Sequence, residues 1–120
     1  MNIGNYTKML ERKYETHEFA DGSKYLTVIF TDPKYQLITT FLFVEVNSFE
    51  DWIKEDFDDV LSGKYPFRES GGNICGLEIT PETTKIYNLL VDDEDSDCCE
   101  VDTKELRAII EEWCDKVKNL

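Results

Sequence analysis

The residues that could carry out chemistry are few. The sequence contains one histidine, His17, and no catalytic motif surrounds it. A histidine that transfers protons needs a positioned partner, and an isolated one in an alternating strand is more often structural or exposed. Neither the nucleophile motif G-x-S-x-G nor a glycine-rich phosphate loop occurs in the chain. The sequence therefore predicts no catalytic residue, no bound cofactor and no enzyme activity.

The cysteines do not have the spacing of a metal site. Common zinc sites use C-x-x-C pairs that bring two thiolates to one ion. No such pair is present among Cys75, Cys98, Cys99 and Cys114. We expect free thiols, mostly buried in the core, as is usual in a reducing compartment. The sequence leaves the role of the adjacent Cys98 and Cys99 open.

An acidic run has part of the spacing of a calcium loop. Asp93, Asp95 and Asp97 occupy the first three ligand positions of such a loop. The glycine and glutamate that the loop also needs are replaced by Cys98 and Lys104. We therefore expect a solvated acidic loop rather than a metal site.

Negative charge is the strongest chemical signal. The chain has 13 basic and 26 acidic side chains, for a net charge of −13. Residues 1–46 hold 5 basic and 6 acidic groups, whereas residues 47–120 hold 8 and 20. Such a surface repels nucleic acid and anionic lipid and attracts basic proteins, although acidity also serves solubility alone. We expect a basic protein partner, and neither nucleic acid nor membrane.

Two acidic groups are the candidate partner-binding residues. Both lie in the strongly acidic second part of the chain, where carboxylates are too numerous to be buried without partners. The first group is the run Asp92, Asp93, Glu94, Asp95 and Asp97. The second lies on a predicted helix and comprises Glu55, Asp56, Asp58 and Asp59.

The elements that position these groups begin with a β-rich region. Residues 24–46 are rich in β-branched and aromatic side chains, which favours two strands joined by a turn at Asp32, Pro33 and Lys34. Another turn at residues 21–23 would join them to a first strand within residues 5–19, for which a short helix is the competing interpretation. A three-stranded meander is expected, with residues 36–46 as its third strand, which should be central in the sheet and covered on much of both faces.

Two helices and a second hairpin are predicted after it. An apolar stripe from Phe49 to Leu61 predicts a helix capped by Ser48 and ended at Gly63. Residues 64–73 are expected to form a loop. Residues 74–80 and 84–91 flank turn residues and predict a hairpin, followed by a short strand at 98–101. The capping box of Asp102 and Glu105 begins the last helix.

These elements make one domain. The chain, residues 1–120, is long enough for its own hydrophobic core. The predicted fold is α+β, with a single antiparallel sheet of about five or six strands and two amphipathic helices packed on it. No apolar run reaches the roughly 20 residues that span a bilayer. The N-terminus lacks the apolar region of a secretory signal, so we expect a cytoplasmic protein.

The C-terminal part of the sequence resembles a known family. Residues 74–88, I-C-G-L-E-I-T-P-E-T-T-K-I-Y-N, are followed by the acidic stretch and by V-D-T-K-E-L-R-A-I-I-E-E-W at residues 101–113. This order is similar to that of small bacterial immunity proteins, the inhibitors encoded beside polymorphic or contact-dependent toxins. The resemblance covers residues 74–120 and transfers no functional residue.

The resemblance implies an inhibitor that binds a cognate toxin domain. Many such toxins are nucleases with basic active sites, which an acidic domain would block by placing carboxylates where nucleic-acid phosphates bind. The alternative is an acidic secretion chaperone or adaptor, which would bind a client segment. The oligomeric state is left open by the sequence.

Overall fold

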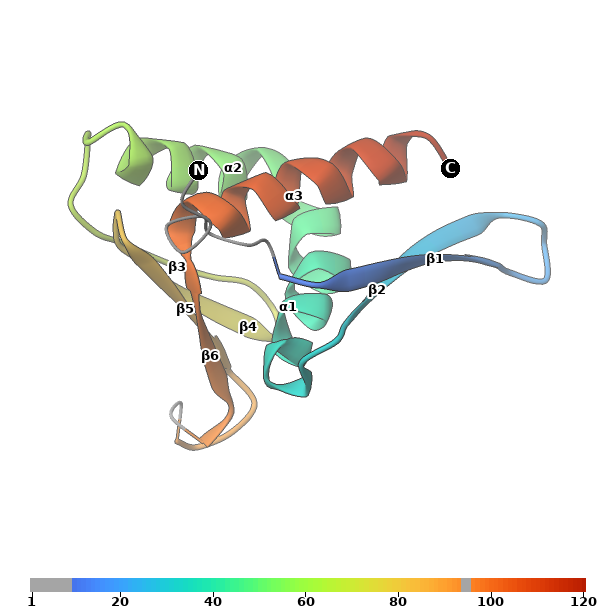
Figure 1. The fold of residues 1–120 in the computed structure, drawn as a ribbon, viewed down its shortest axis with the longest axis horizontal. Helices are drawn as coiled ribbons and strands as arrows, with labels where there is room; N and C mark the ends of the chain where they lie inside the picture. The colour runs from blue at the N-terminus through green and yellow to red at the C-terminus, as the bar shows by residue number, and fades with distance from the viewer. Residues whose placement is uncertain (1–9, 94–95) are drawn as a thin grey trace, which may run out of the picture.

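The structure is a computed structural model that describes residues 10–93 and 96–120 (Figure 1). Its strands and helices follow one another along the chain as β1 (Arg12–Glu18), β2 (Lys24–Phe30), α1 (Gln36–Thr40), α2 (Asn47–Leu61), β3 (Arg68–Gly71), β4 (Cys75–Ile79), β5 (Thr83–Asn88), β6 (Cys98–Asp102) and α3 (Thr103–Lys118). A 3₁₀ turn, Pro33–Tyr35, precedes α1, and a π-helical segment, Phe41–Val46, joins α1 to α2. None of the described helices is long and apolar enough to cross a membrane.

The α+β class is confirmed, but the strands form two sheets rather than one. Strands β1 and β2 make a two-stranded antiparallel ribbon, and the other four form an antiparallel sheet in the order β3-β4-β5-β6. Figure 1 shows the ribbon projecting away from the four-stranded sheet, with the helices between and above them. The expected single sheet was wrong because the segment that would have joined its two parts is helical.

That segment is residues 33–46, which were predicted to form a turn and a central strand. The Asp32 side chain instead accepts a hydrogen bond from the Lys34 N–H (3.1 Å), and Pro33 occupies the first helical position. These are signals of a helix start. The apolar run that follows buries residues at helical spacing, with exposed fractions of 0–1 % at Ile38, Phe41, Leu42 and Val46. A helix buried on most sides is apolar almost all round, and such a sequence is easily mistaken for a central strand.

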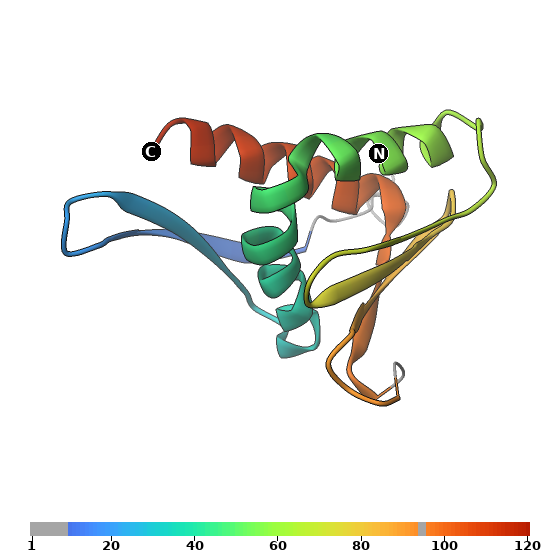
Figure 2. The same ribbon diagram turned by 180° about the vertical axis from the view of Figure 1, so that it is seen from behind.

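The helical stretch continues into α2, which lies beside α3 (Figure 2). The predicted helix is present, but it is continuous with the π-helical segment, and Ser48 lies inside it rather than capping it. A kink at Phe49, with φ −134° and ψ 38°, bends the continuous helical stretch near the start of α2. Ile53, Phe57 and Val60 are buried as the apolar stripe predicts. The helix stops at Gly63, whose φ of +86° lies in the left-handed region that glycine tolerates.

The elements from β4 onward agree with the sequence prediction. The β4–β5 hairpin is present, and Cys75, Leu77 and Ile79 are buried on one face. The Asp102 side chain accepts a hydrogen bond from the Glu105 N–H (2.9 Å), which is the predicted cap of α3. The N-terminal strand is also confirmed from Arg12 onward, whereas residues 5–9 of that prediction lie outside the described residues. Strand β3 was missed, because its sequence contains no apolar alternation.

A buried carboxylate joins the helical stretch to the four-stranded sheet. Glu45, in the π-helical segment, is only 1 % exposed. Its Oε1 accepts from the Asn73 N–H (2.9 Å), and its Oε2 accepts from the N–H groups of Ile74 (2.6 Å) and Cys75 (2.8 Å). A Cβ on Gly72 would lie 1.8 Å from Oε1, so only glycine lets the carboxylate approach this turn. The contact fixes the β3–β4 connection against the helices.

We predict that Glu45→Gln strongly destabilises the fold. The amide keeps one acceptor oxygen but points an NH₂ group at backbone donors, so buried N–H groups lose their partner. The expected loss in the free energy of unfolding is about 2–4 kcal/mol, measured by urea denaturation. The exposed Glu11→Gln should change it by less than about 0.5 kcal/mol. Equal stabilities of the two variants would show that the Glu45 carboxylate is dispensable.

The β1–β2 ribbon is anchored to α3 through Glu112. The Glu112 Oε1 atom accepts a hydrogen bond from Arg12 Nη2 (2.8 Å) and another from the Tyr14 hydroxyl. Burial alone would raise the pKa of Glu112, but these hydrogen bonds outweigh it and bring the pKa below its usual value. Burial and the same contact raise the pKa of Tyr14 to about 12. The anchor therefore depends on an ionised Glu112.

This anchor should make the stability of the protein depend on pH. A carboxylate whose pKa is lowered by folding contributes stability above its unfolded pKa of roughly 4.3, and loses that contribution as pH falls through the folded value. Glu112→Gln should lower the free energy of unfolding by about 1 kcal/mol at pH 7, since the site is partly exposed. The difference from the wild type should shrink between pH 5 and pH 3 in urea titrations. A difference that is constant over this range would contradict the assignment.

Candidate functional site

The acidic residues of α2 are largely used inside the molecule. Asp56 is 4 % exposed, and its carboxylate lies 3.3 Å from Arg68 Nη2 on the edge strand β3. The same Arg68 atom lies 3.5 Å from the Asp59 carboxylate. Two of the four predicted binding residues on this helix therefore hold β3 against α2. A partner could reach Asp56 only by displacing the sheet edge.

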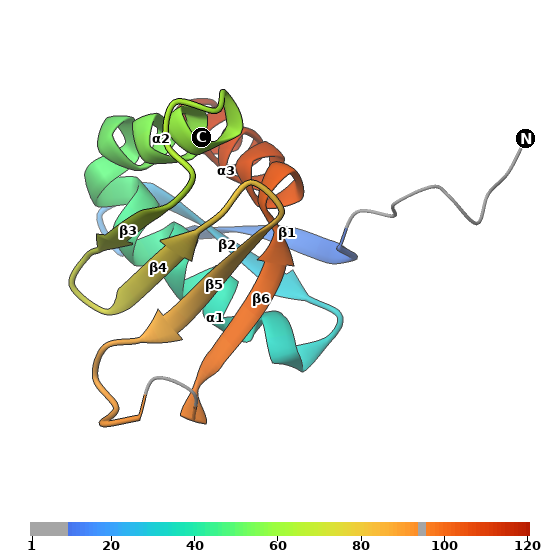
Figure 3. The same ribbon diagram turned by 90° about the vertical axis from the view of Figure 1, so that its left-hand side faces the viewer.

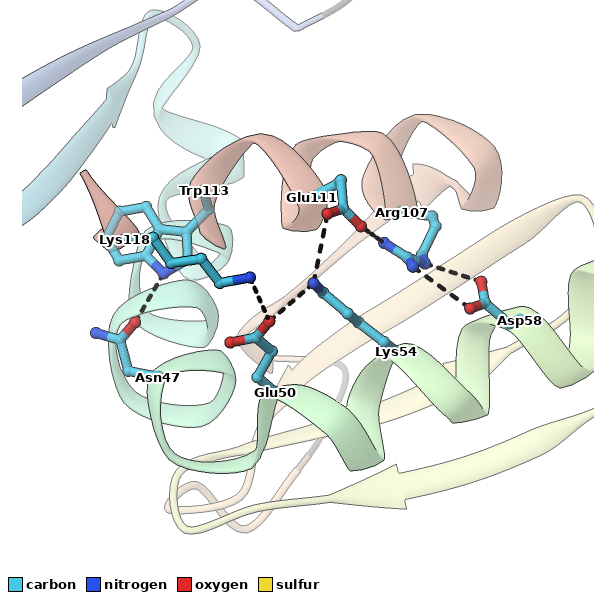
Figure 4. A network of polar contacts seen from close by, with 8 residues as sticks. All are labelled: Asn47, Glu50, Lys54, Asp58, Arg107, Glu111, Trp113 and Lys118. Carbon is cyan, nitrogen blue, oxygen red and sulfur yellow. Dashed lines mark hydrogen bonds and ion pairs between the residues drawn. The ribbon is translucent and has the colours of Figure 1, made fainter. Parts of the chain in front are cut away.

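The exposed side of α2 forms a charge-balanced network with α3 (Figure 4). Arg107 pairs with Asp58 (2.9 Å) and with Glu111 (3.0 Å), and its hydrogen bond lowers the pKa of Glu111. Lys54 pairs with Glu50 (2.8 Å) and lies 3.5 Å from Glu111, while Lys118 lies 3.9 Å from Glu50. Three cations thus face three carboxylates. Glu55 is the member of the predicted helix group that is exposed and makes no ion pair among the described residues.

The acidic loop between β5 and β6 differs from α2 in the exposure and pairing of its carboxylates. Asp92, Asp93 and Asp97 are exposed, and Glu94 and Asp95 lie outside the described residues. Within the described part of the chain, neither Asp92 nor Asp97 makes an ion pair. Figure 1 shows this loop and α2 at opposite ends of the four-stranded sheet, so the two predicted acidic groups do not form one site.

Hydrogen bonds hold the described ends of this loop. The Asn88 side-chain amide donates to Asp97 Oδ2 (2.9 Å), and the Asn88 N–H donates to the Asp97 carbonyl (3.0 Å). The Ser96 N–H donates to the Asp93 carbonyl (3.0 Å). Asp97 also borders an open cleft of about 590 Å³ between this loop and the start of α1, where Lys34 and Gln36 line the other side. The loop therefore presents Asp97 at a fixed position.

The other candidate residues have structural environments. His17 stacks on Tyr25 with ring centroids 5.0 Å apart, and its Nε2 lies 3.0 Å from the Thr27 hydroxyl. The four cysteines are free thiols, as predicted, and burial raises the pKa of Cys75 and Cys99 to about 12. The described residues contain no group of side chains that could hold a metal ion.

Sequence reasoning missed the two arginines that neutralise α2. Arg68 lies in a segment predicted to be a loop, and Arg107 is separated from Asp58 by 49 positions. Opposite charges at that separation carry no local signal. The one available signal was the i,i+4 spacing of Arg107 and Glu111, which is favourable on a helix.

We predict that Arg68 contributes to stability more than Arg107 does. Arg68→Gln would leave the buried Asp56 carboxylate without its cation, which should lower the free energy of unfolding by about 1–3 kcal/mol. Arg107→Gln breaks a pair with Asp58, whose side chain is 60 % exposed, so its effect should stay below about 1 kcal/mol. Thermal or urea unfolding of both variants checks the order. A reversed order would be incompatible with the role given to Asp56.

The comparisons with known proteins identify the family. No protein-family profile matches the sequence, and no solved structure matches it. The chain is 47 % identical over 83 residues to a curated protein of Bacillus cereus described as "Immunity protein", and the match covers 69 % of this chain and 71 % of that relative. Identity at this level over most of both chains confirms the resemblance seen in the C-terminal sequence. The chain belongs to the family of bacterial immunity proteins that includes this Bacillus cereus relative.

Proposed function

We propose that this protein acts in the cytoplasm by binding a cognate toxin, a nuclease domain with a basic active site, and that the loop of residues 92–97 contacts that site. Family membership supports the inhibitory role. The net charge of −13 supports a basic target. The observation that carries the choice of surface is the exposure of Asp92 and Asp97 without ion pairs in the described part of the chain.

The distribution of ion pairs favours the loop over α2. A carboxylate that already pairs with an arginine loses that interaction when a partner's cation replaces it, so the net gain is small. Asp56, Asp58 and Asp59 are in this position. The loop carboxylates Asp92 and Asp97 have no such pair to lose. Of the helix group, Glu55 alone could contribute at the margin of an interface.

The proposed mechanism is steric and electrostatic. Carboxylates of the loop would pair with the lysines and arginines that otherwise hold the phosphates of the nucleic acid, so the substrate would be excluded. Charge complementarity of this kind accelerates encounter and fixes orientation. Because the pairs at the rim are screened by salt, association should slow as ionic strength rises. No covalent chemistry is required.

The test begins with the identity of the partner. The tagged protein is used for a pull-down from its source cells at low and moderate salt, and the C-terminal domain of each captured protein is expressed in a heterologous host. We expect one basic domain that arrests growth, and growth restored when this protein is co-expressed. If every captured domain is harmless, or if co-expression fails to restore growth, the proposed function is wrong. Several unrelated clients held through unfolded segments would instead indicate a chaperone.

We predict that neutralising the loop weakens this complex. The triple variant Asp92→Asn, Asp93→Asn and Asp97→Asn should raise the Kd at low salt by about tenfold or more and flatten its salt dependence. A control variant with the same net charge, Asp51→Asn, Asp115→Asn and Glu11→Gln, removes exposed carboxylates elsewhere and should change the Kd by less than about threefold. Calorimetric titration of the purified toxic domain measures both. Equal effects would assign the binding to another surface.

A further inference from the structure

The four-stranded sheet has one face that no described element covers. Figure 3 shows β3 to β6 in front of the helices, with the outer face of the sheet directed at the viewer. The inner face carries the buried residues of the alternating pattern, among them Leu77, Ile86 and Val101. Antiparallel sheets commonly leave one face in solvent, and its residues are then polar. What distinguishes this outer face is the sign of its charges.

A row of charged residues crosses all four strands on this face. Glu69 of β3 is paired with Glu78 of β4, Glu78 with Lys85 of β5, and Lys85 with Glu100 of β6. Side chains paired in this way stand next to one another on the same face. None of the three glutamates makes an ion pair or a side-chain hydrogen bond with another described residue. The row therefore presents excess negative charge to solvent.

The pairing of Glu69 with Glu78 is unfavourable for the isolated fold. Like charges directly opposite each other on neighbouring strands destabilise a sheet. Ion pairs between α2 and α3 match opposite charges elsewhere in the molecule, whereas in this row the cation Lys85 lies opposite both Glu78 and Glu100 and leaves Glu69 facing Glu78. A cation supplied by a partner between Glu69 and Glu78 would turn this repulsion into attraction.

The tyrosine beside the row lies against the sheet. Gly76 of β4 is paired with Tyr87 of β5, and a Cβ on Gly76 would lie 2.4 Å from Tyr87 Cζ. The tyrosine ring therefore lies down over the glycine, and Tyr87 is only 8 % exposed. The largest side chain on this face is thus buried, and the exposed side chains of the row are the glutamates Glu69 and Glu100.

The row is continuous with the acidic loop. Strand β5, which carries Lys85, ends at Asn88, and strand β6, which carries Glu100, begins at Cys98, so the described loop residues 89–93 and 96–97 lie at the end of the same sheet. Asp97 immediately precedes β6. We propose that the outer face of β3 to β6, centred on Glu69, Glu78 and Glu100, is the docking surface for a lysine- or arginine-bearing face of the cognate toxin, with Asp97 at its edge. The proposal rests on the proposed function and extends its interface from a loop to a sheet.

The test reverses the charges at the two exposed ends of the row. The double variant Glu69→Lys and Glu100→Lys is titrated with the purified toxic domain identified by growth rescue, next to a matched control, Glu11→Lys and Glu18→Lys. All four residues are exposed glutamates, and both variants shift the net charge equally. We expect the sheet variant to raise the Kd at low salt by about 30-fold or more, and the control by about threefold or less. Far-ultraviolet circular dichroism and urea unfolding verify that both are folded.

The outcomes separate this inference from the proposed function. If the wild type binds and neutralises the toxic domain while the sheet variant behaves like the control, the docking surface is wrong and the function stands. If the wild type does not bind any toxic domain, both fail. Carbodiimide labelling of carboxylates, read by mass spectrometry, gives a second readout that needs no substitution. Glu69, Glu78 and Glu100 should be protected in the complex while Glu11 and Glu18 are not, and unchanged labelling of the row would overturn the inference.

Discussion

The structure depends on the three backbone N–H groups that converge on the Glu45 carboxylate. A buried charge is tolerated only when it is paired or fully hydrogen-bonded. Loss of these hydrogen bonds would therefore leave the buried carboxylate and the N–H groups without partners. It fixes the π-helical segment against the β3–β4 turn. Through that turn it sets the position of β3, and through β3 the position of Arg68 beside α2. Glu69 and Glu78, on the sheet face that no described element covers, lie on the two strands that this turn joins.

The C-terminal part of the fold could be predicted because its signals are local. The Asp102 cap, the apolar stripe of α3 and the β4–β5 turn each specify one structure within a few residues. Residues 36–46 could not be assigned from apolar content, since a buried helix and a central strand share that composition. The deciding signal was the pair Asp32 and Pro33, which begins a helix as readily as it makes a turn.

The candidate site was predictable to the extent that it depends on solvation. A run of carboxylates at residues 92–97 has to remain in water, and its described members are exposed. The α2 group looked equivalent in sequence, but its partners Arg68 and Arg107 come from other elements and only the fold brings them together. The row of glutamates was hidden for the same reason. Glu69, Glu78 and Glu100 become neighbours only once the register of four strands is known.

The balanced network between α2 and α3 has a consequence for how the molecule moves in an electric field. Opposite charges cancel there, whereas the outer face of the sheet and its loop remain negative. Within that network three cations offset three carboxylates, so the surface that it occupies attracts a cation less than the row of glutamates does. A positively charged molecule that approaches by diffusion would therefore be drawn more strongly to the sheet than to the paired charges between the helices. The orientation of this protein toward its partner during the encounter would then depend on the paired charges between α2 and α3 as much as on the glutamates of the row.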